Sequence, residues 1–103
     1  MASPMRIRAT TVDGVTEVKA LMSHPMETGQ RKDSAGKLVP AHHITEVTAM
    51  HNDKVVLSAN WGAAVSQNPF LSFKFKGGAP GDKVIVSWKD NKGESRTDEV
   101  ALR

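Results

Sequence analysis

The chain contains no cysteine and no tyrosine. Without cysteine it cannot form a disulfide, offer a thiolate ligand to a metal or use a thiol as a nucleophile. Thiol enzymes and thiolate metal carriers are therefore excluded for this chain acting alone. The same absence leaves the redox compartment undetermined, because a thiol-free protein is compatible with oxidising and reducing surroundings.

Long hydrophobic runs are missing as well. No stretch approaches the roughly 20 apolar residues that a membrane-spanning helix needs. Near the start of the chain, Arg6 and Arg8 flank Ile7, so the apolar core of a secretory signal is absent there. We therefore expect the chain to carry no export signal of its own.

Aromatic residues are scarce, and the basic residues are dispersed. The chain has two tryptophans and three phenylalanines, which leaves few platforms on which nucleic-acid bases could stack. Its 14 lysines and arginines are interspersed with 11 carboxylates, for a net charge of +3. This pattern disfavours nucleic-acid binding and favours anionic small molecules or an acidic protein partner.

Alternation of apolar and polar residues predicts an all-β fold. At 103 residues the chain is long enough for one domain, 1–103, and too short for two. About seven strands are expected, and no segment shows helical periodicity. The expected strands lie at 6–11, 16–22, 41–51, 54–60, 71–76, 83–89 and 95–102. Seven short strands separated by turns are typical of an immunoglobulin-like, fibronectin type III-like antiparallel β-sandwich.

The pattern predicts four further details of the fold. The apolar phase slips between Ile44 and Val47, which predicts a β-bulge near residues 45–46. In the fourth strand Val55 is expected to face inward, together with Leu57 and Ala59. Residues 61–65 are compatible with a short helical turn or with a crossover between sheets. Large apolar residues are expected to anchor the core, with Trp88 as a core residue; the others are Leu71, Phe73, Phe75 and the valines.

The stretch from Ser23 to Ile44 is the candidate functional region. It is longer than a hairpin connection requires, and it places histidine, methionine, carboxylate and guanidinium side chains close together in sequence. Long loops on a small β scaffold often carry function. Turn residues and solvated charges would equally explain a plain connection, so both interpretations stay open.

Catalysis by this chain alone is not indicated. Ser23 and His24 are sequence neighbours, whose side chains point to opposite faces of an extended backbone, and the carboxylates are scattered. A copper-binding or copper-carrying β-sandwich protein of the periplasm is the alternative, because histidine and methionine suit copper. Its candidate ligands are His24, His42, His43, His51, Met22, Met26 and Met50. Their spacing argues against a metal site and for surface histidines, because no pair recurs at ligand spacing.

Several separated motifs, in order, resemble the SoxZ family. The first is His-Pro-Met-Glu-Thr-Gly at 24–29, followed by Arg-Lys-Asp at 31–33. Gly-Lys-Leu-Val-Pro-Ala-His-His-Ile follows at 36–44, Ser-Gln-Asn-Pro-Phe at 66–70 and Trp-Lys-Asp-Asn-Lys-Gly at 88–93. The likeness covers nearly the whole chain, and one departure is His43, where the family pattern suggests an aromatic residue.

The resemblance implies a function in bacterial thiosulfate oxidation. SoxZ is the cysteine-free subunit of the SoxYZ sulfur carrier, in which a cysteine on the C-terminal arm of SoxY holds the sulfur intermediates. The resemblance therefore implies a non-catalytic scaffold without a cofactor, a heterodimer with SoxY, and contact with SoxAX, SoxB and SoxCD through that complex. It also implies a periplasmic location, reached by export together with a signal-bearing SoxY. The isolated chain could form a homodimer through the surface that SoxY covers.

We expect the partner-facing surface at the long loop. Apolar residues there can be buried by association, Met26 is an adaptable contact, and Arg31 can grip a carboxylate or a carbonyl with its planar fork. The candidate interface residues are His24, Pro25, Met26, Glu27, Thr28, Gly29, Arg31, Lys32, His42 and Ile44.

Overall fold

Two antiparallel sheets make up the computed structural model, which describes residues 3–62 and 64–103. The seven strands are β1 (Arg6–Val12), β2 (Val15–Leu21), β3 (Ile44–His51), β4 (Lys54–Asn60), β5 (Phe70–Lys76), β6 (Lys83–Asp90) and β7 (Ser95–Ala101). The all-β prediction and the expected number of strands are confirmed. In the part of the chain that the structure describes, no helix is long and apolar enough to cross a membrane.

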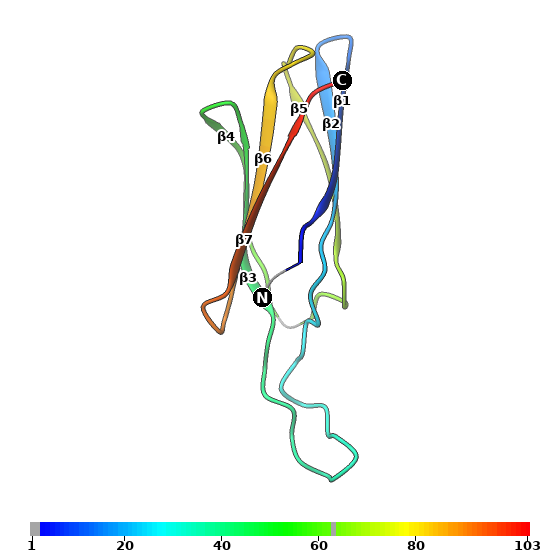
Figure 1. The fold of residues 1–103 in the computed structure, drawn as a ribbon, viewed down its shortest axis with the longest axis vertical. Coiled ribbons are helices and arrows are strands. Elements are labelled where there is room, and N and C mark those ends of the chain that lie inside the picture. The colour runs from blue at the N-terminus through cyan, green and yellow to red at the C-terminus, as the bar shows by residue number, and fades with distance from the viewer. Residues whose placement is uncertain (1–2, 63) are drawn as a thin grey trace.

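The strand order is that of an immunoglobulin-like sandwich. One sheet has the order β1-β2-β5 and the other the order β4-β3-β6-β7. The segment after β4 crosses from the second sheet to the first, which agrees with the crossover interpretation of residues 61–65; Ala63 lies outside the described residues. Figure 1 shows the two sheets as layers with β1 and β2 on one side and β3, β4, β6 and β7 on the other.

The core lies between the inward-facing rows of the central strands. In β6 every second side chain is buried, and Trp88 is only 1% exposed, so its predicted core position is confirmed. The register between β3 and β6 shifts between Ile44 and Glu46, at the site of the predicted bulge. This shift puts Ile44 and Val47 in the interior although they differ in strand parity, because the extra residue resets the alternation.

The prediction for Val55 is wrong. Its side chain is 54% exposed, whereas Val56 and Leu57 are partly buried against the core. A second register shift, between Ala49 and Met50, leaves Val56 as an extra residue between Val55 and Leu57. A bulge of this kind reverses the facing of the residues on one side of it, and the alternation of β4 alone did not reveal it.

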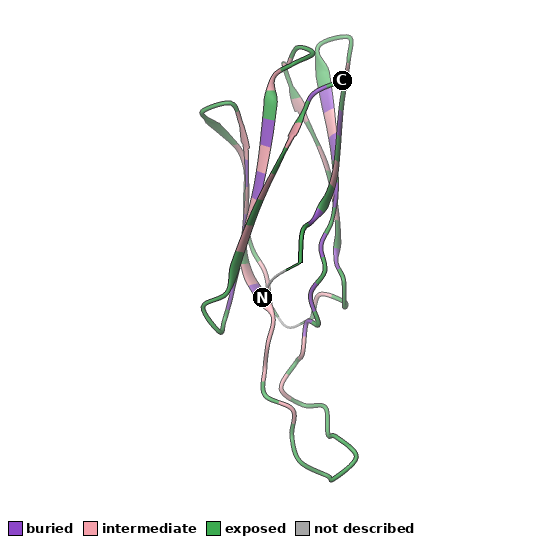
Figure 2. Ribbon diagram, in the orientation of Figure 1, coloured by how far each residue is buried: buried purple, intermediate pink, exposed green. Residues whose placement is uncertain are grey.

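Residues 22–43 between β2 and β3 form an arm that projects beyond the end of the sandwich (Figure 1). The molecule measures 54 × 20 × 19 Å, and the arm accounts for much of its length. The far part of the arm is exposed, while the part nearest the sheets contains buried positions (Figure 2). The candidate functional region therefore has an interior base and a solvated tip.

Candidate functional site

Backbone hydrogen bonds hold the base of the arm together. The N–H groups of Glu27 and His42 donate to each other's carbonyl oxygens at 2.7 and 3.0 Å. Two hydrogen bonds also join His24 to Asn68. The His24 N–H donates to the Asn68 side chain at 3.0 Å, and the His24 carbonyl accepts from the Asn68 N–H at 2.9 Å. The two ends of the arm are thus joined to each other and to the segment before β5.

Asn91, in the turn after β6, fixes the returning end of the arm. Its side chain accepts from the N–H of His43 at 2.8 Å and donates to the carbonyl of Ala41 at 2.8 Å. Its own N–H donates to the carbonyl of His43 at 3.1 Å. Three hydrogen bonds from one asparagine therefore set the path of residues 41–43 into β3.

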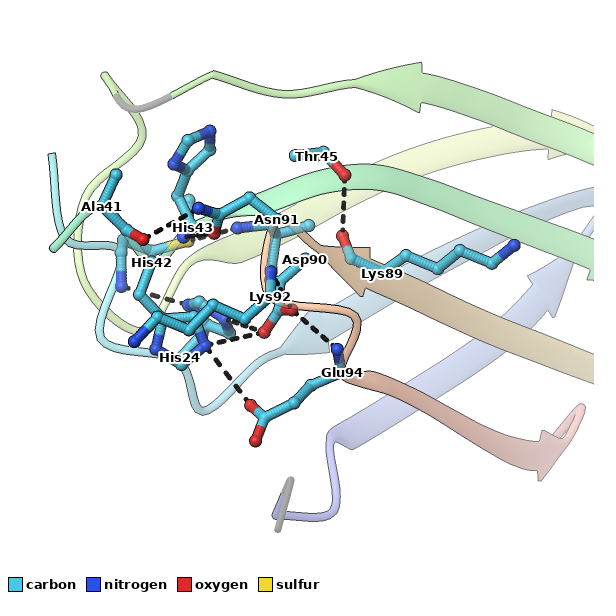
Figure 3. Close-up of polar contacts among 12 residues, drawn as sticks. His24, Ala41, His42, His43, Thr45, Lys89, Asp90, Asn91, Lys92 and Glu94 are labelled. Carbon is cyan, nitrogen blue, oxygen red and sulfur yellow. Dashed lines mark hydrogen bonds and ion pairs between the residues drawn. The ribbon is translucent and has the colours of Figure 1, made fainter. Parts of the chain in front are cut away.

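The centre of this base is a buried carboxylate with two histidines (Figure 3). His24 Nε2 lies 3.0 Å and His42 Nε2 lies 2.8 Å from the same oxygen, Asp90 Oδ2. The other oxygen, Oδ1, accepts the N–H groups of Lys92 and Glu94 at 3.0 and 2.8 Å. Asp90 has a fully buried side chain, and His24 is 3% exposed. We call His24, His42 and Asp90 the arm-base cluster.

The hydrogen bonds keep Asp90 ionised. Burial raises the pKa of Asp90, but the hydrogen bonds from His24, the Glu94 N–H, His42 and the Lys92 N–H outweigh burial and lower it to about 2. A carboxylate that accepts four donors in the interior is stabilised in its charged form, since each donor is lost or weakened on protonation.

His24 is held in one neutral tautomer. The N–H of Met26 donates to His24 Nδ1 at 3.1 Å, so Nδ1 carries a lone pair and the ring proton is on Nε2, directed at Asp90. Met26 has a φ of 49°, in the left-handed region that is rare for residues with a side chain, and it is only 5% exposed. This strained backbone at a buried position indicates a locally constrained site.

The arm-base cluster has the donor set of a transition-metal site but an unfavourable protonation pattern. Its two ring nitrogens and its carboxylate oxygen all lie within 4.8 Å of one another. A metal would need the lone pair of His24 Nε2, and the ring proton would then move to Nδ1, where it would face the Met26 N–H. Metal binding therefore costs one buried hydrogen bond as well as the Asp90 contact.

A polar cleft of about 510 Å³ opens beside the cluster. Its walls include His24, His42, Glu94 and Trp88, together with Ser3, Ser23, Pro25, Gln67 and Asn68. His42 is the accessible member of the cluster, and its Nε2 also lies 3.3 Å from Glu94 Oε2. The indole nitrogen of Trp88 is buried and has no hydrogen-bond partner among the described residues.

The structure divides the ten candidate interface residues into two groups. His24, Met26 and Ile44 are interior, and the Ile44 N–H donates to the Met26 sulfur at 3.4 Å. In this conformation these three shape the base of the arm and do not present a contact surface. The others are exposed or partly exposed: Pro25, Glu27, Thr28, Gly29, Arg31, Lys32 and His42.

Arg31 and Glu27 form an ion pair within the arm. Arg31 Nε lies 3.1 and 3.0 Å from the two Glu27 oxygens, and its Nη2 lies 2.9 Å from one of them. The expected grip of Arg31 on a carboxylate is thus made inside this chain. The pair lowers the pKa of Glu27 and raises the pKa of Arg31 through the hydrogen bond between them.

Sequence reasoning missed Asp90 as a site residue and treated the histidines as surface groups. His24 is in the interior, and His24 and His42, 18 positions apart, share one carboxylate. One signal was available: Val84, Val86, Trp88 and Asp90 have the same parity in β6, which places a carboxylate on the core face. A charged residue at such a position needs partners, and histidines are suitable ones.

The strand order and the arm define the fold class of this chain. It is a thiol-free, seven-stranded β-sandwich of the immunoglobulin-like type with an ordered arm. The sequence profile described as "Sulphur oxidation protein SoxZ" matches residues 5–101. The chain belongs to the SoxZ family.

Solved structures support the fold. A mutant superoxide reductase (neelaredoxin) from Archaeoglobus fulgidus in the reduced form is similar, with a TM-score of 0.69 and 20% identity over 98% of this chain and 89% of that one. A hypothetical protein from Pyrococcus horikoshii OT3 has a TM-score of 0.68 and 17% identity over 99% and 89% of the two chains. At these identities the likeness shows the fold alone. No curated protein matches the chain in the sequence comparison.

Replacing Asp90 by asparagine is expected to destabilise the fold by about 2–3 kcal/mol at pH 7. A side-chain amide at position 90 would satisfy either the two backbone N–H groups or the two histidines, and His24 cannot change tautomer without losing the Met26 N–H. Urea unfolding of Asp90→Asn and of the wild-type protein measures this loss. Asp53→Asn, in the exposed turn between β3 and β4, is the control.

The same comparison has a defined pH dependence. The folded-state pKa of Asp90 is about 2, below the ordinary value of 3.8, so its contribution to stability is complete above about pH 5 and is lost as pH falls towards 2. The lowered pKa of Asp90 corresponds to a contribution of about 2 kcal/mol to the free energy of unfolding. The stability difference between wild type and Asp90→Asn should therefore shrink between about pH 5 and about pH 2. A difference that stays constant over this range would contradict the assignment.

Proposed function

We propose that this chain is the non-catalytic scaffold subunit of a SoxYZ carrier complex. Its partner is SoxY, whose cysteine arm holds sulfur intermediates during thiosulfate oxidation. The match to the SoxZ family over residues 5–101 carries this proposal. The absence of cysteine supports it, because the chain cannot bind sulfur covalently through a thiol of its own and needs a partner that can.

The exposed part of the arm is proposed as a surface for SoxY or for the enzymes SoxAX, SoxB and SoxCD. The Arg31–Glu27 pair and the paired backbone at its base order the arm before a partner arrives. A preordered segment loses less conformational entropy on binding than a flexible one. The tip adds exposed Lys32 and Leu38, the latter 60% exposed, to the available contact surface.

Mixing the protein with purified SoxY is expected to give one heterodimer peak in size-exclusion chromatography. Arg31→Ala/Lys32→Ala should weaken the complex or slow reconstituted thiosulfate oxidation about tenfold, as expected for losing a partner contact. Lys54→Ala/Lys83→Ala removes the same charge at the other end of the sandwich and should match wild type. Separate elution of SoxY and wild-type protein in mild salt would overturn the scaffold proposal. If both double variants behave alike, the arm is not a partner contact.

The proposal also places the protein in the periplasm. The family resemblance motivates this location, which is reached by export of the folded chain with a SoxY that bears a signal. Fractionation of cells with and without SoxY tests it. The chain should be periplasmic only when signal-bearing SoxY is made, and periplasmic protein in cells that lack SoxY would contradict joint export.

Copper binding is the second candidate, because the arm-base cluster brings two histidine nitrogens and a carboxylate oxygen within 4.8 Å of one another. His51 is excluded from that cluster, since its Nε2 lies 2.8 Å from Asp82 Oδ2, a separate pair that lowers the pKa of Asp82. Met22 and Met26 are interior. Because His24 Nε2 is protonated, we expect no tight stoichiometric uptake of copper at neutral pH. Tight uptake that His42→Ala abolishes and His51→Ala preserves would favour the copper carrier instead.

A further inference from the structure

The two long sides of the sandwich are closed to different degrees. On one side β1 lies beside β7, and the last residue completes the contact. The Thr11 N–H donates to the Arg103 carbonyl at 3.1 Å, and the Arg103 N–H donates to the Ala9 carbonyl at 3.2 Å. On the other side, β4 pairs with β3 alone and β5 with β2 alone, as far as the described residues show. One side is therefore partly closed by contacts of Arg103 with β1, whereas the other side has two free strand edges.

Burial across the β2–β5 pair shows how far the core is open. Thr16, Val18 and Ala20 of β2 are fully buried. Their direct partners in β5 are Phe75, Phe73 and Leu71, all facing the core and all only partly buried. The inner row of side chains is thus covered on the central strand and becomes accessible on the edge strand next to it.

The facing edge of the other sheet is open in the same way. Val56 and Leu57 of β4, with Trp61 and Val65 after it, pack against the core but remain partly exposed. An edge strand lined by aromatic and branched residues invites pairing with another chain, and such edges are usually shielded. Here Lys74 and Lys76 are the charged residues that β5 itself contributes, both on its outer face.

The outer face of β5 indicates the charge of a strand that would pair there. Lys74 has a side chain that is 68% exposed, and its contact with Glu17 is long, at 3.9 Å. Lys76 is also exposed and lies opposite Val15 in β2. A strand added beside β5 would point alternate side chains at the lysines and at the phenylalanine row. Carboxylates suit the positions that face the lysines, and apolar groups suit the positions that face the phenylalanines.

We propose that the β5 edge receives an extended strand of the partner polypeptide, with alternating carboxylate and apolar residues. This inference rests on the scaffold function proposed above and assigns the strand to SoxY. The added strand would extend the β1-β2-β5 sheet and cover Leu71, Phe73 and Phe75. A second copy of this chain fits less well, because its own β5 would bring two more lysines to the same outer face.

Hydrogen exchange of the protein alone and in complex with purified SoxY tests the edge directly. The β5 amides that point away from β2 should exchange quickly in the free protein and become protected in the complex. Lys74→Gln/Lys76→Gln should weaken SoxY binding about tenfold and reduce its salt dependence. Arg6→Gln/Arg8→Gln removes the same charge from the outer face of β1, at the opposite edge of that sheet, and should match wild type.

The outcomes separate this inference from the proposed function. SoxY binding without protection of β5, or with equal effects of the two double variants, overturns the edge assignment and leaves the scaffold function standing. Failure of SoxY to bind wild-type protein overturns both. Protection of β5 in the protein alone, appearing with dimer formation as concentration rises, overturns the choice of an acidic partner strand in favour of a second copy.

Discussion

The Asp90 carboxylate is the interaction on which the arm depends. One of its oxygens accepts hydrogen bonds from both histidine rings, and the other accepts hydrogen bonds from two backbone N–H groups. Asp90 therefore joins the outgoing end of the arm, the returning end and the turn after β6. These three segments are distant in sequence. Because a buried charge is costly without partners, the arrangement stabilises the fold only when all three segments are in place. The position of the arm is therefore coupled to the integrity of the sandwich.

Much of the fold could be predicted from the sequence because strand alternation is a local signal. In β6 the interior residues Val84, Val86 and Trp88 alternate with a row that is polar except at Ile85. The interior row of β6 follows from that pattern. The slip in phase after Ile44 predicted a bulge, since only an extra residue reconciles the two parities with one core. The failure at Val55 arises because three consecutive apolar residues, 55–57, are compatible with either facing of β4. The bulge opposite Ala49, which decides between the two facings, is set by pairing between strands.

The arm-base cluster could not be assembled from sequence spacing. His24 and His42 are separated by the arm, and Asp90 lies at the far end of β6, so only the tertiary fold brings them together. The sequence did place a carboxylate on the core face of β6, and a buried carboxylate needs hydrogen-bond partners. Strand parity alone does not identify those partners. The sequence also could not predict which ring nitrogen of His24 carries the proton. That depends on the N–H of Met26, whose left-handed backbone follows from the packing of the arm.

Under the scaffold function proposed above, the chain would serve sulfur chemistry by holding a partner. The structure has two surfaces of contrasting kinds that are available for such a contact. The arm is ordered in advance by its own hydrogen bonds, so contacts made there lose little further entropy on binding. The β5 edge is incomplete in the free chain, with backbone groups unpaired on one side among the described residues and phenylalanines partly exposed. An incomplete edge favours a permanent partner, because dissociation would expose apolar surface again. An exposed, preordered arm suits partners that bind and leave. The contrast argues for a lasting contact along the sheet and transient contacts at the arm.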